Sequence, residues 1–191
     1  MSLPDLEQVE IASSDALWAW LEAHHEQEQS VLLVTWKKAA GERYVGREPV
    51  LDALIAYGWI DGRRYKHEDA LRTIQLISPR AQKVWAETYK QRAMKLEQEG
   101  RMKDAGRAAI ALAKSTGLWD AAQDVDALLV PDVLGVALDT KHARAQFDAM
   151  APSYRRNVLR WLHSAKQEKT QLARADKIAD FASRSEKIPQ Y

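Results

Sequence analysis

The sequence predicts an α+β fold, in which a small, mostly antiparallel sheet with packed helices is followed by a C-terminal helical module. Three observations indicate this class. Val31–Trp36 is a continuous apolar run rich in β-branched residues, which is typical of a buried strand. Residues 71–77 alternate between apolar and polar side chains, which is typical of a half-buried strand. Beyond Pro79 little strand signal remains, and helical periodicity dominates.

The N-terminal part of the chain supplies the expected sheet and the first helices. Ser13 to Asp15 offers an N-cap for a helix that runs to about Glu26. Residues 43–45 are expected to form a short strand beside residues 31–36. A second helix is expected from Pro49 to Tyr57, because proline suits the first turn of a helix.

The remainder of the chain is expected to be helical. Its apolar residues recur at helical spacing between glycine and proline breaks. The expected helices cover residues 80–99, 104–115, 131–138, 141–150 and 168–183. A further helix, capped by Ser153, is expected before the last of these. The segment 118–130, rich in Asp and Ala, marks a module boundary. We therefore predict an α+β domain over residues 1–125 and a helical module over residues 126–191.

Composition excludes several classes of protein. The chain has 191 residues, of which 46% are hydrophobic and 29% charged, with a net charge of +1, so a folded protein with a real core is expected. No apolar run is long enough to span a bilayer, so no membrane insertion is expected. Cysteine is absent, which excludes disulfides and thiolate chemistry. The first residues lack the pattern of a signal peptide, so we expect a cytoplasmic protein.

Charge is distributed unevenly along the chain. The first 30 residues carry seven acidic side chains and no Lys or Arg, whereas eleven basic and five acidic residues follow from Lys141 onward. Such asymmetry can mark an anionic partner, either an acidic protein or a nucleic acid. It is equally compatible with basic residues that pair with acids on the outside of a helical bundle. We consider nucleic acid the less favoured partner. The residues concerned are Arg155, Arg156, Arg160, Lys166, Lys169, Arg174 and Lys177.

The least generic segment is the glycine-flanked stretch from Tyr57 to Arg64. Gly58 directly follows the predicted helix, at the position where the backbone commonly adopts a left-handed conformation that glycine tolerates. Asp61 and Gly62 form a turn dipeptide, so Asp61 can be a turn residue that hydrogen-bonds its own backbone. Alternatively, Asp61 holds Arg63 or Arg64 in place, and a fixed guanidinium is suited to carboxylate or phosphate.

The order and spacing of several short motifs resemble the YdeI/OmpD-associated family of bacterial proteins, over nearly the whole chain. These motifs are Tyr57-Gly58-Trp59-Ile60-Asp61-Gly62, Ser78-Pro79-Arg80 with Trp85, Gly100-Arg101-Met102 with Ala105-Gly106, Ala113-Lys114 with Gly117-Leu118-Trp119, Val130-Pro131-Asp132, Trp161 with Ala165-Lys166, and Thr170. The family's names refer to bacteriocin protection and to association with an outer-membrane porin. The resemblance implies a non-catalytic binding or stress-protection accessory, and it brings no catalytic mechanism with it.

Standard catalytic motifs are missing from the sequence. There is no phosphate-binding glycine loop and no nucleophile elbow. The five histidines lack metal-ligand spacing, so no cofactor and no metal are predicted.

A set of cations with neighbouring tryptophans is the remaining candidate site. If the strands pair, several of these residues are expected to meet at one rim of the sheet and to form a pocket for a small anion. The alternative is a solvated charged rim with the tryptophans in the core. An enzyme acting on a small anionic substrate also stays open, with Lys37, Asp61, Arg63 and Arg80 as the residues to mutate. The predicted ligand-binding residues are Lys37, Lys38, Trp59, Asp61, Arg63, Arg64, Arg80 and Trp85.

Overall fold

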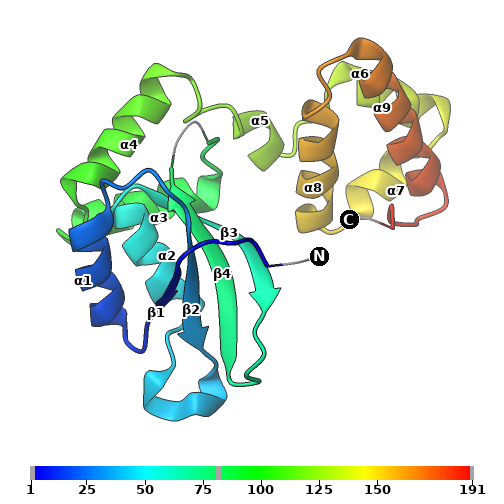
Figure 1. The fold of residues 1–191 in the computed structure, drawn as a ribbon. Coiled ribbons are helices and arrows are strands. Elements are labelled where there is room, and N and C mark those ends of the chain that lie inside the picture. The colour runs from blue at the N-terminus through cyan, green and yellow to red at the C-terminus, as the bar shows by residue number, and fades with distance from the viewer. Residues whose placement is uncertain (1–2, 81–82, 190–191) are drawn as a thin grey trace. The chain divides into compact units, whose positions relative to one another are not determined.

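The computed structural model describes residues 3–80 and 83–189 of the chain. The chain divides into two compact units, Met1–Ala121 and Ala122–Tyr191 (Figure 1). A four-stranded sheet lies in the first unit, and the described part of the second unit is helical. The predicted α+β class is therefore confirmed.

The first unit combines the sheet with helices. Its strand order is β1-β2-β4-β3, with β1 parallel to β2 and the other neighbours antiparallel. The elements in chain order are β1 (Gln8–Glu10), α1 (Ser14–His24), β2 (Val31–Trp36), the 3-10 helix η1 (Lys38–Arg43), α2 (Arg47–Ala56), β3 (Trp59–Lys66), β4 (Arg72–Pro79), α3 (Glu87–Gln98) and α4 (Asp104–Ser115).

Strand β2 forms the centre of the first unit. All six of its side chains are buried, because it lies between β1 and β4 and both of its faces are covered. On one face Val31 and Leu33 join the main core with Ile77 of β4. On the other face Leu32 and Val34 form a smaller cluster. Burial on both faces explains why the sequence of β2 is continuously apolar instead of alternating.

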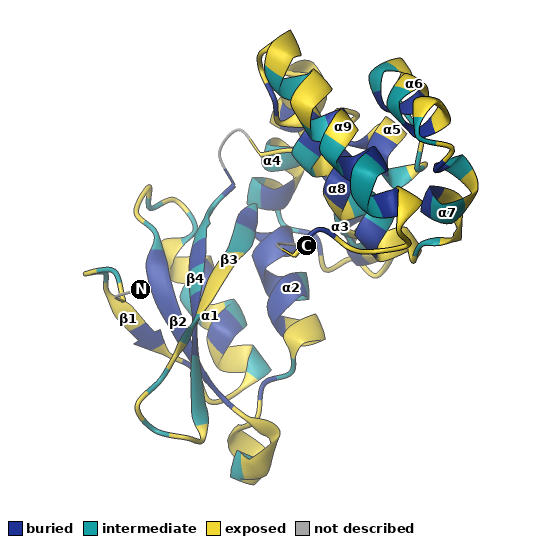
Figure 2. Ribbon diagram, turned by 90° about the vertical axis from the view of Figure 1, so that its right-hand side faces the viewer, coloured by how far each residue is buried: buried dark blue, intermediate teal, exposed yellow. Residues whose placement is uncertain are grey.

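Helices α1 and α2 supply much of the main core. In α1, Leu17 and Leu21 are fully buried, and in α2 most residues from Val50 to Ala56 are buried. Only the N-terminal turn of α2 is exposed, and the rest of the helix is buried or half-buried (Figure 2). Trp59, which begins β3, lies in the same core with no exposed surface.

The end of α2 is held tightly against the start of α4. Gly58 has a φ of +72°, the left-handed conformation expected after a helix C-terminus. The backbone N–H of Lys103 donates to the Ala56 carbonyl at 3.2 Å. A Cβ on Gly106 would lie 2.3 Å from the Ala56 oxygen and 2.7 Å from the Ile55 oxygen. Only glycine allows the two helices to approach this closely.

Several elements differ from the sequence-based expectation. Residues 38–43 form a 3-10 helix, so the predicted strand over residues 43–45 is wrong, and only Tyr44 makes an isolated bridge to Trp36. Strands β1 and β3 were not predicted. The helix expected from Arg80 begins only at Glu87. The Ala81–Gln82 part of that prediction lies outside the described residues.

Asp61 and Gly62 do not form a turn, and the turn interpretation of Asp61 is wrong. They lie inside β3, where a β-bulge interrupts the pairing with β4 between Asp61 and Arg64. Asp61 is opposite Ile77, and Arg64 is opposite Gln75. A Cβ on Gly62 would lie only 3.2 Å from the Leu76 oxygen, which accounts for the glycine at this position.

The second unit is a small helical bundle. Its core contains Leu134 and Leu138 of α6, Phe147 of α7, Val158 of α8 and Ile178 of α9, all buried. The predicted helix over residues 168–183 matches α9. The helices of this unit are α5 (Gln123–Asp126), α6 (Asp132–Thr140), α7 (Arg144–Ala149), α8 (Pro152–His163) and α9 (Glu168–Ser183).

Candidate functional site

Arg80 is a buried cation at the end of β4. Its backbone N–H donates to the Gly58 carbonyl at 2.8 Å, so the turn after α2 fixes its position. Its guanidinium carbon lies 4.0 Å from the centre of the Trp85 ring and 4.9 Å from that of Tyr89. The residue is 7% exposed. Nη2 donates to the Val84 carbonyl at 3.3 Å, whereas Nε and Nη1 have no hydrogen-bond partner among the described residues.

A hydrogen-bonded group centred on Asp61 lies beside this cation. Asp61 is opposite Ile77, a residue of the helix-covered core, and so lies on the same face of the sheet. The Tyr89 hydroxyl of α3 donates to Asp61 Oδ1, and Gln75 Nε2 donates to Asp61 Oδ2 at 3.2 Å. The side chain of Asp61 is thus held by strand β4 and helix α3.

Burial governs the ionisation of this cluster. It lowers the pKa of Arg80 to about 10, although Tyr89 and Asp61 attract the cation and act in the opposite direction. Burial also raises the pKa of Tyr89 to about 12, and the hydrogen bond to Asp61 adds to this effect. At neutral pH the cluster therefore contains a charged guanidinium and a protonated phenol.

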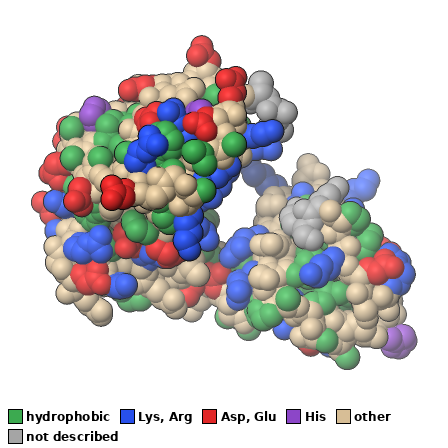
Figure 3. Space-filling model, turned by 90° about the horizontal axis from the view of Figure 1, so that it is seen from below, with side chains coloured by type: hydrophobic (Ala, Val, Ile, Leu, Met, Phe, Trp, Pro, Cys, Tyr) green, Lys and Arg blue, Asp and Glu red, His purple; other side chains and the backbone are tan. Residues whose placement is uncertain are grey.

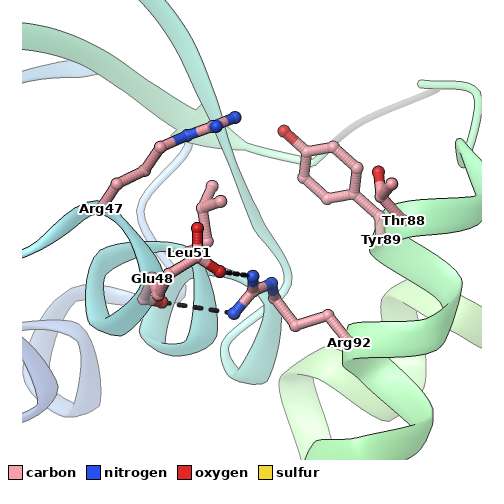
Figure 4. A pocket seen from close by; sticks show the side chains of 6 residues that line it. All are labelled: Arg47, Glu48, Leu51, Thr88, Tyr89 and Arg92. Atoms are coloured by element: carbon pink, nitrogen blue, oxygen red, sulfur yellow. Dashed lines mark hydrogen bonds and ion pairs between the residues drawn. The ribbon is translucent and has the colours of Figure 1, made fainter.

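A cavity of about 200 Å³ opens next to Tyr89, between the start of α2 and the start of α3. Arg47 and Tyr89 reach into it from opposite sides (Figure 4). Arg92 of α3 lines it from below, and its guanidinium is bound to Glu48 of α2. The residues that line the cavity are Arg47, Glu48, Leu51, Thr88, Tyr89 and Arg92.

The two arginines of the cavity differ in their partners. Arg92 is neutralised by Glu48 and Asp52. Arg47 makes no ion pair with any residue that the structure describes, and its charge lowers the pKa of Arg92 in addition to the effect of burial. The cavity therefore has an excess of positive charge, carried by Arg47, and the Arg80 guanidinium lies 4.9 Å from the centre of the Tyr89 ring.

The structure brings only part of the predicted site together. Asp61, Arg80 and Trp85 form the cluster described above. Lys37 follows β2 at the other end of the sheet, where its Nζ donates to the Ala70 carbonyl at 2.7 Å, and Lys38 begins η1. Strand β4, with eight residues at about 3.3 Å each, separates these lysines from Arg80. The expected meeting of the two groups at one rim is not observed.

The other predicted residues have different environments. Arg63 and Arg64 are exposed on β3. Trp59 is part of the core, where its Nε1 donates to the His25 carbonyl at 3.3 Å. Trp85 is also fully buried, with 1% exposure, but one side of its ring contacts Arg80. Trp59 therefore has no surface to offer a ligand, and Trp85 contributes by holding the cation.

Sequence reasoning missed Arg47, Tyr89 and Gln75. Tyr89 was assigned to an ordinary helical position and Gln75 to the polar face of a strand. Arg47 lay just before the predicted helix, which was expected to begin at Pro49. Gln75 gave no distinct local signal, because apolar and polar side chains alternate along β4. The contact between α2 and α3 depends on tertiary packing, and no sequence pattern predicts it.

Neither a metal-ligand cluster nor a membrane-spanning helix is found among the described residues. Within residues 3–80 and 83–189, no group of three or more His, Cys, Asp or Glu side chains is placed to hold a metal ion. Over the same residues, no helix combines the length and the apolar character that a membrane crossing requires.

Some basic side chains of the second unit form ion pairs with acids of the same unit. Ion pairs join Lys141 to Asp176 at 2.9 Å and Arg155 to Asp148 at 2.9 Å. Arg160 also pairs with Asp126. On the face of the molecule seen in Figure 3, basic and acidic side chains are intermixed. A partner that binds the C-terminal basic helices stays a prediction.

Comparison with known families gives a separate result for each part of the chain. Residues 9–109 match the model of a domain of unknown function (DUF8412). Residues 127–184 match the model described as "Bacteriocin-protection, YdeI or OmpD-Associated", which confirms the suspected relationship for that segment. No curated protein and no solved structure matches the chain.

Proposed function

We propose that this chain is a non-catalytic accessory of the bacteriocin-protection type. The chain belongs to the DUF8412 family through residues 9–109, and it carries a YdeI/OmpD-associated domain over residues 127–184. In this proposal its N-terminal unit binds a small anion, such as a phosphate or a short carboxylate, in the cavity between α2 and α3. Cytoplasmic residence remains part of the proposal.

The position of Arg47 carries the proposal. Its guanidinium faces a cavity without an ion-pair partner in the described part of the chain, and the Tyr89 ring lies opposite (Figure 4). A guanidinium is a fixed fork that matches carboxylate and phosphate oxygens. Buried Arg80, whose guanidinium carbon lies 4.9 Å from the centre of the Tyr89 ring, adds positive potential with little screening by solvent. A cavity of about 200 Å³ suits an anion of a few heavy atoms.

The same geometry favours binding over catalysis. Asp61 is the carboxylate of the cluster, and both of its oxygens accept hydrogen bonds, from Tyr89 and from Gln75. An acceptor occupied in this way fixes the position of its donors and is poorly placed to abstract a proton from a ligand. We therefore assign Asp61 a positioning role.

Removal of the Arg47 guanidinium is expected to weaken anion binding. Titration of the full chain with inorganic phosphate and with succinate, followed by calorimetry, should show saturable binding that weakens about tenfold in Arg47→Ala, because a charge-assisted hydrogen bond is lost. Arg64→Ala is the matched control: it removes an exposed arginine outside the cavity and should bind like the wild type. If neither anion binds the wild type, the proposed anion-binding cavity is refuted. If the affinity falls equally in both variants, the binding is a nonspecific effect of charge.

The protective role is expected to be measurable in cells. Expression of the chain in a bacteriocin-sensitive bacterium should increase survival at a fixed bacteriocin dose, and Arg64→Ala should protect equally well. If anion binding supports this role, Arg47→Ala protein present at the same level should protect less. No protection by the wild type would contradict the accessory role. Full protection by Arg47→Ala would separate that role from the cavity.

A further inference from the structure

A second hollow of the first unit lies between α3 and α4, away from the Arg47 cavity. It has a volume of about 530 Å³, within the range of small-molecule sites. Its floor is apolar and includes Ala93, Ile110 and Ala111. Met94 on its margin is 51% exposed and adds apolar surface to the hollow. We call this hollow the α3–α4 groove; its lining residues are Ala93, Met94, Glu97, Arg107, Ile110, Ala111, Lys114 and Trp119.

The two ends of the α3–α4 groove differ in charge. At the end near the connection between the helices, Arg107 is neutralised by Glu97 at 3.1 Å and by Asp104 at 2.7 Å. At the other end, the ammonium group of Lys114 lies 5.2 Å from the centre of the Trp119 ring. Lys114 forms no ion pair with a described residue. Positive charge is therefore available at only one end of the groove.

A buried lysine reinforces that end. The Lys90 ammonium lies 5.4 Å from the Trp119 ring, and its side chain is only 10% exposed. Its partner Asp120 is 3.4 Å away but 68% exposed, so water weakens this pair. Trp119 itself is fixed by packing on Trp85 at 5.1 Å. Two ammonium groups thus converge on one rigid indole ring.

An apolar groove with one cationic end is complementary to an amphipathic anion. We propose that the α3–α4 groove binds a carboxylate with a linear alkyl tail. The tail would lie on Ala93, Ile110 and Ala111, and the carboxylate would lie beside Lys114 and Trp119. This inference is independent of the proposed anion cavity, because the two sites share no lining residue.

The chain-length dependence of binding tests the apolar part. Isothermal calorimetry on the full chain with hexanoate, octanoate and decanoate should give affinities that rise about fourfold for each added methylene, the value expected for burial of a CH₂ group. Octanol should bind about fivefold more weakly than octanoate, since it lacks the charge. Absence of saturable octanoate binding, or equal affinity for all three acids, would overturn the proposal.

Matched variants test the location. Ala111→Trp fills the groove from an exposed helical position and should weaken octanoate binding more than tenfold without loss of helical content by circular dichroism. Lys114→Gln should weaken octanoate binding about threefold and leave octanol binding unchanged. Lys95→Gln removes an exposed lysine of α3 outside the groove and should change neither. Wild-type octanoate affinity in Ala111→Trp, or equal losses for acid and alcohol in Lys114→Gln, would refute the site. Arg47→Ala should bind octanoate normally, which separates this test from that of the anion cavity.

Discussion

Gly106→Ala is expected to lower the free energy of unfolding by about 3 kcal/mol, at the upper end of the usual cost of overpacking. The added Cβ would lie 2.3 Å from the Ala56 oxygen, 2.6 Å from the Met102 sulfur and 2.7 Å from the Ile55 oxygen. Two of these three atoms belong to the backbone of α2, so relief requires α4 to move away from α2. Chemical denaturation of the variant, monitored by Trp fluorescence, measures the loss directly.

Gly100→Ala provides the control for this substitution. A Cβ at this position meets nothing within 4 Å, and only the φ of +67° disfavours alanine. The expected cost is about 1 kcal/mol. If Gly106→Ala costs no more than Gly100→Ala, the close approach of the two helices is not a determinant of stability.

Asp61→Ala is expected to lower the free energy of unfolding by about 2–3 kcal/mol. The substitution leaves the Tyr89 hydroxyl without its acceptor, and the Gln75 amide keeps only its hydrogen bond to the Gly62 carbonyl at 3.3 Å. Half-buried donors without partners are costly, and Arg80 loses the carboxylate that attracts it. Asp61→Asn retains an acceptor oxygen without the charge, so about half of this loss is expected for it. Urea denaturation of the three proteins at neutral pH distinguishes the two contributions.

A double mutant connects Asp61 to Arg80. If Asp61 compensates the buried cation, Arg80→Met should cost less in the Asp61→Ala background than in the wild type, because the uncompensated charge is removed. Asp69→Ala, a carboxylate in the exposed β3–β4 connection, is the control and should show additive behaviour with Arg80→Met. Additivity of Asp61→Ala with Arg80→Met would mean that the two side chains do not interact.

The fold could be predicted where local pattern and tertiary environment agree. β2 is buried on both faces and is an almost continuous apolar run, and in α9 the buried residues Ala175, Ile178, Ala179 and Ala182 recur at helical spacing. β3 could not be found, because its bulge and its exposed basic residues break the alternation that marks a strand. β1 has only three residues, too few for any periodic signal. Residues 43–45 have strand-like side chains, but the chain uses them to close a 3-10 helix.

The candidate site was only partly predictable for a related reason. Asp61 and Arg80 stand out in the sequence, because a carboxylate and an arginine adjoin strong glycine and proline signals. Their actual partner is Tyr89, a residue of α3 that contacts them through tertiary packing. Lys37 was included because it ends a strand. The antiparallel pairing of β2 with β4 places the end of one strand beside the start of the other, which separates Lys37 from Arg80.

The bulge in β3 also affects how the sheet meets other protein molecules. β3 is an outer strand of the sheet, and outer strands offer unpaired backbone groups on which another chain can add a strand. The irregular register between Asp61 and Arg64 twists this edge, and Arg63, Arg64 and Lys66 place positive charges along it. Two such edges repel each other and cannot align. The arginines that suggested a ligand site therefore have a second expected consequence, which is resistance to aggregation through the β3 edge of the sheet.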